Sequence, residues 1–223
     1  MMEKIEKLRQ TLEAISSSHA PACLACSFGV EDMVLIDMIA RHKIDISAFT
    51  LDTGRLHDET YELMQLAKAR YELEIAVYFP NSDDIERLSR KSGPNGFYDS
   101  AEIRKSCCRI RKIEPLKRAL SGKNAWITGL RRQQSTTRSD LRAAEYDAEN
   151  GLYKYNPLFE WSEEEIWNYI RMHGVPYNRL HDSGFPSIGC SPCTRAIAKG
   201  EDIRAGRWWW EDASNRECGI HRK

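Results

Sequence analysis

Two pairs of cysteines constrain this chain more than any other feature of its sequence. One pair is vicinal, Cys107 and Cys108, and in the other Cys190 and Cys193 are separated by a serine and a proline. Zinc and iron–sulfur clusters both prefer thiolate sulfur, so four thiols in two tight pairs are typical of one bound metal centre. A fold that binds one centre must bring these two distant segments together.

The spacing within the first pair favours a cluster over zinc. Zinc pairs usually leave two or more residues between ligands, whereas neighbouring residues direct their side chains apart. A cube of iron and sulfur offers separate corners to diverging thiolates, and a single zinc ion does not. We therefore predict a [4Fe-4S] cluster ligated by Cys107, Cys108, Cys190 and Cys193.

Composition excludes several classes of protein. Lysine plus arginine equals aspartate plus glutamate, 33 against 33, so no overall field recruits nucleic acid or an anionic membrane. No apolar run approaches membrane-spanning length, and the charged segment that starts at Met1 does not resemble a signal peptide. Seven cysteines without such a signal predict a reducing compartment, the cytoplasm, and thiols used for metal binding or catalysis.

Short apolar runs alternate with amphipathic segments along the chain, which predicts an α/β fold with a parallel-rich twisted sheet and flanking helices. Strands are expected at 22–28, 44–51, 74–79, 125–130 and 152–155. Helices are expected at 3–16, 31–40, 57–70, 83–90 and 101–113, the last of them stopping near Pro115 because proline lacks an N–H donor. A further helix begins after Ser162, where Glu165 completes a capping box.

The whole chain, 1–223, is predicted to form one domain, with 201–223 as a mobile C-terminal tail. A second C-x-x-C pattern, Cys23 and Cys26, falls in the first expected strand. Residues three apart in a strand point to opposite faces, so this pair is predicted to line the core and not to chelate a metal.

Three expected strands end in segments suited to a nucleotide. In parallel sheets ligands bind at the carboxyl ends of the strands, and glycine lets a ligand approach the backbone. The segments are Ser27-Phe28-Gly29-Val30-Glu31-Asp32, Leu51-Asp52-Thr53-Gly54-Arg55 and Thr128-Gly129-Leu130-Arg131-Arg132. Each alone is an ordinary strand-to-helix turn, but three at one sheet edge indicate nucleotide binding.

Several cationic residues and one further cysteine suggest anion chemistry. Lys112 lies four residues beyond Cys108, on the same face of the expected helix. Arg204 and Arg207 are three apart and can grip one oxyanion as forked donors. Cys218 follows them and three tryptophans; because nearby cations lower a thiol pKa, it is a candidate nucleophile.

The sequence closely resembles the assimilatory adenylyl-sulfate reductases, the cluster-containing branch of the phosphoadenylyl-sulfate reductase family. The motifs that carry this resemblance run through nearly the whole chain. They are Cys107-Cys108 with Lys112, Leu51-Asp52-Thr53-Gly54-Arg55-Leu56-His57, Gly129-Leu130-Arg131-Arg132, Cys190-Ser191-Pro192-Cys193-Thr194, Arg204-Ala205-Gly206-Arg207-Trp208-Trp209-Trp210 and Glu217-Cys218-Gly219-Ile220-His221.

The resemblance implies a sheet similar to that of the ATP-pyrophosphatase, or adenine nucleotide alpha hydrolase-like, fold. The wider superfamily has the first loop S-G-G-x-D-S, and here Phe28 replaces a glycine. A bulky side chain at the pyrophosphate position is expected to prevent ATP cleavage. By family analogy the adenosine lies against Ser27, Leu51, Thr53, Gly129 and Arg138, and the phosphosulfate is held by Lys112, Arg204, Arg207 and His221.

The activity that the resemblance implies is thioredoxin-dependent reduction of adenylyl sulfate to sulfite and AMP in assimilatory sulfate reduction, leading to cysteine biosynthesis. The Cys218 thiolate attacks the sulfur of the activated sulfate, AMP leaves, and a thiosulfonate remains on Cys218. A thioredoxin-like dithiol then releases sulfite and supplies both electrons, so the cluster need not transfer any. A homo-oligomer is compatible with this activity.

Three alternatives remain open at this point. The first keeps the reaction and changes the substrate to 3′-phosphoadenylyl sulfate, or accepts both compounds. The second is an RNA sulfurtransferase, which should have the S-G-G-x-D-S loop and a basic surface, and the sequence has neither. The third is a zinc-binding module without enzymatic activity, which leaves the nucleotide loops and Cys218 without a role.

Overall fold

The structure is a computed structural model that describes residues 1–134, 138 and 140–211. Residue contacts divide the chain into two compact units, each assembled from segments that are not consecutive in sequence. The first unit takes Met1–Thr50, Asp58–Ala76 and Gly122–Leu180, and the second takes Leu51–His57, Val77–Ser121 and the described part of His181–Lys223. The organisation of the chain as one domain with a tail stays a prediction.

A six-stranded sheet has the order β3-β2-β1-β4-β6-β5, and each of its strands lies wholly or partly in the first unit. Its strands are β1 (Ala22–Ala25), β2 (Ser47–Leu51), β3 (Ile75–Tyr78), β4 (Ala125–Ile127), β5 (Ala144–Asp147) and β6 (Leu152–Tyr155). The central strand β1 pairs in parallel with β2 and β4, and β4 pairs in parallel with β6. The parallel-rich α/β sheet expected from the sequence is therefore present.

One strand was missed by the sequence analysis. Strand β5 pairs antiparallel with β6, so the sheet is mixed. Its four residues alternate between exposed and half-buried, and two of them are acidic, a composition depleted in strands. The strand forms because β6 pairs with it at the edge of the sheet. The hydrophobic pattern of residues 144–147 alone does not indicate this pairing.

Strand β6 has the predicted bounds, whereas β1, β2, β3 and β4 are shorter than the sequence predicts. The first ends at Ala25 and not at residue 28, because Phe28 adopts φ 62°, a left-handed conformation that is incompatible with a strand. The strand expected at 44–51 begins at Ser47, and the one expected at 125–130 ends at Ile127. For β1, β2 and β4, buried apolar residues lie just outside the paired stretch, so burial without pairing extended the predicted strand.

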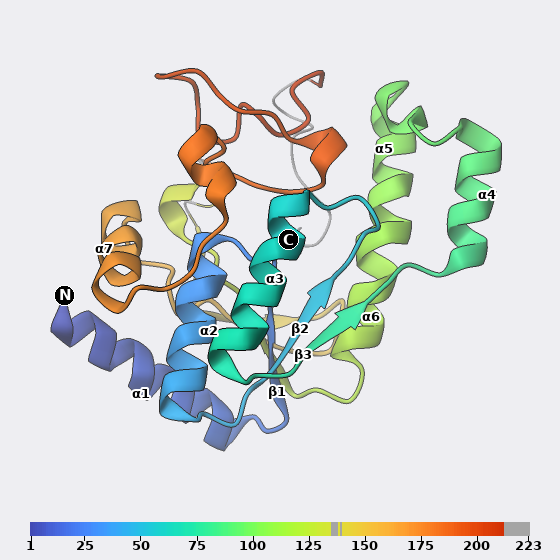
Figure 1. Cartoon of the computed structure of the whole chain (residues 1–223). Helices are drawn as coiled ribbons and strands as arrows, with labels where there is room; N and C mark the ends of the chain where they lie inside the picture. The colour runs from blue at the N-terminus through green and yellow to red at the C-terminus, as the bar shows by residue number, and fades with distance from the viewer. Residues whose placement is uncertain (135–137, 139, 212–223) are drawn as a thin grey trace. The chain divides into compact units, whose positions relative to one another are not determined.

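Four helices pack with the sheet in the first unit. They are α1 (Met2–Ser18), α2 (Val30–His42), α3 (Asp58–Tyr71) and α7 (Glu163–His173). Helices α2 and α3 run beside one another in Figure 1, and α2 contributes nine buried residues, more than an amphipathic surface helix would. The helices expected at 3–16, 31–40 and 57–70 are thus confirmed, with their ends shifted by one to two residues.

A buried carboxylate joins three of these helices. Asp37 of α2 is 1% exposed and accepts hydrogen bonds from the Tyr169 hydroxyl of α7 at 2.8 Å and the Tyr71 hydroxyl of α3 at 3.0 Å. Arg41, one turn further along α2, donates to the same carboxylate at 3.1 Å. A buried carboxylate is tolerated only when its oxygens are paired, and these three donors satisfy it.

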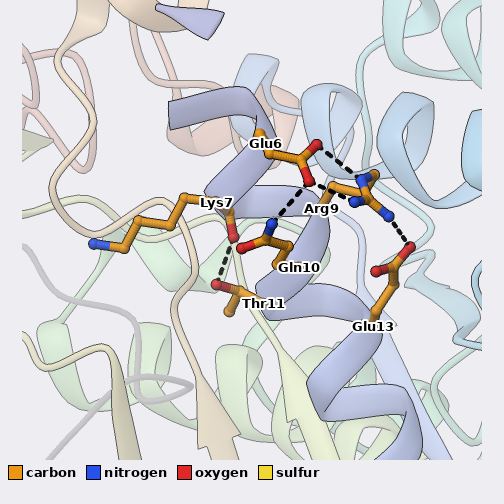
Figure 2. Close-up of polar contacts among 6 residues, drawn as sticks. All are labelled: Glu6, Lys7, Arg9, Gln10, Thr11 and Glu13. Atoms are coloured by element: carbon orange, nitrogen blue, oxygen red, sulfur yellow. Dashed lines mark hydrogen bonds and ion pairs between the residues drawn. The ribbon is translucent and has the colours of Figure 1, made fainter. Parts of the chain in front are cut away.

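The outer face of α1 carries a small network of charges, shown in Figure 2. The Arg9 guanidinium donates to Glu6 at 2.5 Å and to Glu13 at 2.5 Å, while Gln10 donates to Glu6 at 2.8 Å. The hydrogen bond from Arg9 lowers the pKa of Glu6 to about 2. Exposed pairs of this kind contribute little to stability, so α1 is held by its buried face and not by this network.

The second unit contains the helices α4 (Ser82–Ser92), α5 (Ala101–Cys108) and α6 (Glu114–Leu120). The chain stays helical past Pro115, where the sequence predicted a stop, and Figure 1 draws α5 and α6 as one continuous column. A π-helical turn, Arg109–Ile113, connects the two. Within the described part of the chain, none of the helices is both long and apolar enough to cross a bilayer.

The capping box at the start of α7 is confirmed. The Ser162 hydroxyl accepts from the Glu165 backbone N–H at 3.1 Å, and the Glu165 carboxylate accepts from the Ser162 backbone N–H at 2.8 Å. These two bonds satisfy donors that the first turn of a helix leaves without partners.

We expect Ser162→Ala to lower the free energy of unfolding by about 1 kcal/mol, because the N-cap acceptor is lost. Urea denaturation monitored by circular dichroism measures the change. Ser17→Ala is the matched control, since this exposed hydroxyl only bonds back to a carbonyl within α1 and its loss should have almost no effect. Equal stability of wild type and Ser162→Ala would contradict the role of the cap.

Candidate active site

In the first unit the loops after β1 and β4 meet at the carboxyl edge of the sheet. The Asp32 carboxylate accepts from the Ser27 backbone N–H at 2.6 Å and from the Ser27 hydroxyl at 2.7 Å. Gly129 approaches so closely that a Cβ there would lie 2.4 Å from Asp32 Oδ1. Burial raises the pKa of Asp32 to about 6, although the hydrogen bonds from Ser27 and Gly129 oppose that rise.

These contacts place two of the predicted adenosine residues together. Ser27 is exposed while its hydroxyl is oriented by Asp32, and Gly129 is required because no side chain fits between the two loops. Asp32, which was not singled out as a site residue, orders the loop. Its position five residues after Ser27 at a helix start was the available signal.

A buried ion pair fixes the same loops. Arg131 donates to Glu31 at 2.8 Å, with side chains 3% and 12% exposed. The pair fastens the loop after β4 to the first turn of α2. It also fills the N-terminal region of α2 with acidic side chains, Glu31 and Asp32, which disfavours a phosphate at that helix end.

The expectation that the Phe28 side chain lies at the pyrophosphate position is wrong. The Phe28 side chain is 2% exposed and belongs to the hydrophobic core, so it does not occupy the space above the loop. Phe28 stands at the position where the superfamily has a glycine. Its backbone there adopts φ 62°, a conformation that glycine adopts readily. The absence of ATP cleavage stays a prediction without this argument.

Arg138, the third predicted adenosine residue of the first unit, is half-buried. Its guanidinium donates to the Gln134 side-chain oxygen at 2.5 Å, and that oxygen also accepts from the Arg131 backbone N–H at 3.0 Å. Arg138 is therefore linked through Gln134 to the loop that carries Gly129.

In the second unit the vicinal cysteines end α5, directly before the π-turn. The predicted stop near Pro115 is wrong, because the π-turn closes at Ile113 and proline then falls in the first turn of α6, where a missing N–H is tolerated. Single π-turns inside α-helices are frequently found at functional sites. This one sets the direction of the residues that follow Cys108.

Two cations that follow the vicinal cysteines act on thiols of the second unit. Lys112 was predicted to share a helical face with Cys108, and its charge lowers the pKa of Cys193 in the other cysteine pair. Arg111, which sequence reasoning missed, hydrogen-bonds to Cys107 and donates to the Thr53 carbonyl at 2.5 Å. Its i+4 spacing from Cys107 is the same signal that pointed to Lys112.

The Cys190 segment docks on the loop that follows β2. The Thr53 hydroxyl lies 3.3 Å from the Cys190 sulfur, and the Ser191 backbone N–H donates to the Arg55 carbonyl at 2.8 Å. Thr53 is 1% exposed and Leu51 is half-buried, so the Thr53 hydroxyl, predicted to contact adenosine, is engaged with a cysteine in this structure.

The cysteines of the two pairs influence one another electrostatically. Burial raises the pKa of the Cys193 thiol to about 12, with Cys190 and Cys107 adding to the rise while Lys112 and Arg207 oppose it. Burial likewise raises the pKa of Cys107, which Cys190 increases and Arg111 reduces. The distant segments are therefore brought together, as the sequence analysis required.

Arg207 stabilises the loop that precedes Cys190. It is 7% exposed and its Nη1 donates to the Ser187 hydroxyl at 3.2 Å and to the Ile188 carbonyl at 3.3 Å. A Cβ on Gly189 would lie 2.3 Å from its Nη2. Arg204 is half-buried in the preceding turn, where its carbonyl accepts from the Arg207 backbone N–H at 2.9 Å.

Three buried N–H donors, on residues that interact with the cysteine segments, have no acceptor among the described residues. They belong to Arg111 Nε, Arg207 Nε and Trp208 Nε1. Buried donors are nearly always paired in native proteins, and an anionic centre at the thiols would supply acceptors for this set. Four thiolates carrying an iron–sulfur cube would present such an anion, and the donor chemistry therefore fits a cluster.

A compact single-ion site does not form in the part of the chain that the structure describes. There, no three or more histidine, cysteine, aspartate or glutamate side chains lie close enough together to hold one metal ion. The six described cysteines form no disulfide. Cys23 and Cys26 are both buried in the first unit, although Cys26 lies just beyond β1, where its backbone N–H donates to the Phe49 carbonyl.

Two of the predicted site residues, Cys218 and His221, lie outside the described residues. The other predicted contacts to phosphosulfate, Lys112, Arg204 and Arg207, all belong to the second unit, as do the four paired cysteines. The second unit thus combines a cluster of thiols with several cations, an arrangement suited to binding an anion beside a metal centre.

Comparison with known proteins bears on this arrangement. Residues 21–196 match the phosphoadenosine phosphosulfate reductase domain. A relative from Allochromatium vinosum, named adenosine 5′-phosphosulfate reductase, is 54% identical over 98% of this chain and 84% of its own length.

Solved structures agree with the fold. A phosphoadenylyl-sulfate reductase from Candida auris, in complex with phosphate, has a TM-score of 0.73 and 27% identity, covering 85% of this chain and 90% of its own. An FMN adenylyltransferase from Candida glabrata has a TM-score of 0.58 over 96% of this chain and 73% of its own; at 15% identity it shows the fold alone. The adenine nucleotide alpha hydrolase-like fold is confirmed, and the chain belongs to the phosphoadenosine phosphosulfate reductase family.

Proposed function

We propose that this protein reduces adenylyl sulfate to sulfite and AMP. The observation that carries the proposal is the 54% identity to a relative named adenosine 5′-phosphosulfate reductase, which extends over nearly the whole chain. The convergence of Cys107, Cys190 and Cys193 in the second unit supports it, because a family member with this cysteine set is expected to hold a cluster beside its substrate.

The first half of the proposed reaction is nucleophilic displacement at sulfur. The Cys218 thiolate forms a sulfur–sulfur bond with the sulfate group while the bond from sulfur to the phosphate oxygen breaks. AMP leaves with that oxygen, and because phosphate is a competent leaving group, no general acid is required. Lys112, Arg204, Arg207 and His221 are proposed to hold the phosphosulfate and to offset its charge during the attack.

The second half is reduction by an external dithiol of the thioredoxin type. One of its thiolates attacks the Cys218 sulfur, sulfite departs, and the second thiol resolves the mixed disulfide. The dithiol is oxidised to a disulfide and supplies the two electrons, and Cys218 returns to the thiol. Both reactants are expected in a reducing compartment such as the cytoplasm.

The adenosine is proposed to lie against Ser27, Leu51, Thr53, Gly129 and Arg138. Among these, Ser27 is exposed with its hydroxyl oriented by Asp32, and Gly129 gives close access to the backbone. Asp32 and Arg131 act as positioning residues for these two loops.

The metal centre is proposed to be a [4Fe-4S] cluster held by Cys107, Cys108, Cys190 and Cys193. When bound, the cluster would supply a local charge distribution beside the substrate anion, with Arg111 and Lys112 balancing its thiolates. The buried donors on Arg111, Arg207 and Trp208 support an anionic centre at these thiols.

Anaerobically purified protein should contain about four iron atoms and four sulfides per chain. Cys190→Ser should reduce the iron content severely, because a hard hydroxyl replaces a soft thiolate ligand. Cys23→Ala is the matched control: this cysteine is buried in the first unit and should leave iron unchanged. Stoichiometric zinc without cluster absorption would refute the assignment.

Cys218→Ser should abolish sulfite release while leaving iron content and AMP affinity intact, because only the nucleophile is removed. Wild-type enzyme given adenylyl sulfate without reductant should gain one SO₃ group, about 80 Da by composition, on the peptide that contains Cys218. Mass spectrometry of the digested protein measures the adduct. Modification of Cys23 or Cys26 instead, or normal turnover by the serine variant, would rule out this nucleophile.

The second candidate substrate is 3′-phosphoadenylyl sulfate, which the name of the Candida auris structure favours. We expect a higher kcat/KM for adenylyl sulfate, because the more similar relatives are named for that compound. Direct competition between the two substrates, with sulfite and each nucleotide product quantified, decides the preference. A higher kcat/KM for the 3′-phosphorylated compound would reverse the assignment.

A further inference from the structure

A buried ion pair links helix α5 to the segment that precedes Cys218. The Arg104 and Glu211 side chains are 1% and 6% exposed. Arg104 Nε donates to Glu211 Oε1 at 2.9 Å, and its Nη2 donates to Oε2 at 2.8 Å, which makes the pair bidentate. Burial opposes the charge on Arg104, but its hydrogen bond to Glu211 raises its pKa.

Arg104 contacts the vicinal cysteines as well as the later segment. It precedes Cys108 by four residues on α5 and hydrogen-bonds to that thiol. Its guanidinium also lies 4.7 Å from the centre of the Trp208 ring. One side chain therefore fixes the distance between the end of α5 and residues 208–211.

The same segment is fastened to the other cysteine pair through its backbone. The Trp208 backbone N–H donates to the Cys193 carbonyl at 3.2 Å, and Arg207 forms a bridge with Thr194. Trp208 is 1% exposed and adopts φ 44°, a conformation that costs free energy for a bulky residue. The position of residues 207–211 is thus tied to the positions of both cysteine pairs.

Stability alone does not account for a buried pair of this kind. Desolvating two charges costs several kcal/mol, and well-packed apolar residues of similar size are often as stabilising. What the bidentate geometry provides is a unique arrangement of Glu211 against α5. Cys218 follows Glu211 by seven residues, which span at most about 25 Å when extended, so the position of Glu211 limits where the Cys218 sulfur can act.

We propose that Arg104 and Glu211 are positioning residues, which set the base of the segment that delivers Cys218 to the substrate. This inference rests on the proposed role of Cys218 as the nucleophile. The end of α5 then has two roles. It carries the Cys107 and Cys108 thiols, and through the Arg104–Glu211 pair it fixes the starting point of the segment that carries the Cys218 thiol.

Glu211→Gln tests this assignment with little change of shape. The amide keeps one acceptor oxygen but presents an NH₂ group to a guanidinium that can only donate, so the bidentate arrangement is lost. We expect formation of the Cys218 adduct at saturating adenylyl sulfate to slow by about ten- to hundredfold, the loss typical of a misplaced reacting group. Iron content and the dissociation constant for AMP should stay within about twofold of wild type, because neither depends on the reach of the segment.

Two further variants make the result specific. Glu201→Gln removes the same charge from the exposed Arg195–Glu201 pair, which lies in the same stretch of chain, and should react at the wild-type rate. Arg104→Lys keeps the charge but not the fork, and should show a loss between those of wild type and Glu211→Gln.

Each outcome of single-turnover mass spectrometry is decisive. A wild-type rate in Glu211→Gln, with the adduct present on Cys218, overturns the positioning role and leaves the proposed function standing. A slower rate that merely follows a loss of iron also overturns it, since the pair would then be structural. If wild type forms no Cys218 adduct, the proposed function fails first and this inference falls with it.

Discussion

The parallel pairing of β1 with β2 on one side and β4 on the other is the interaction on which the rest of the structure depends. Cys23 lies opposite Ser47 and Trp126 in these two ladders, so all three strands run in the same direction and end at one edge. The segments that leave this edge carry the predicted nucleotide contacts. Without that register Asp32 could not meet both Ser27 and Gly129.

In the second unit, the chemistry depends on cations that serve the protein's own thiols and loops. Arg104 hydrogen-bonds to Cys108, Arg111 to Cys107, and Arg207 supports the loop before Cys190. The proposed cluster would bring negative charge into a partly buried site, and the proposed substrate, with two anionic groups, would add more. Fixed guanidinium groups can balance both, which explains why so many arginines are held by short contacts to their own chain.

Sequence patterns predicted the elements well and their ends poorly. The capping box at Ser162 was predictable because both of its partners are local. The end of β1 was not, since a left-handed Phe28 inside an apolar run leaves no trace in hydrophobic periodicity. The continuation of the helix past Pro115 was missed for a related reason: the rule for proline assumes α-helical spacing, and a π-turn changes that spacing.

By itself the sequence determined the chemistry of the site: two cysteine pairs, a basic set after them, and motifs in the order of one reductase family, all of which are properties of residue type and spacing. Only the tertiary structure decided which cation faces which thiol. Lys112 lowers the pKa of Cys193 in the other cysteine pair, and the Arg104–Glu211 pair joins segments that are remote in sequence. Such contacts depend on helical phase and on how the loops pack, and short-range patterns contain neither.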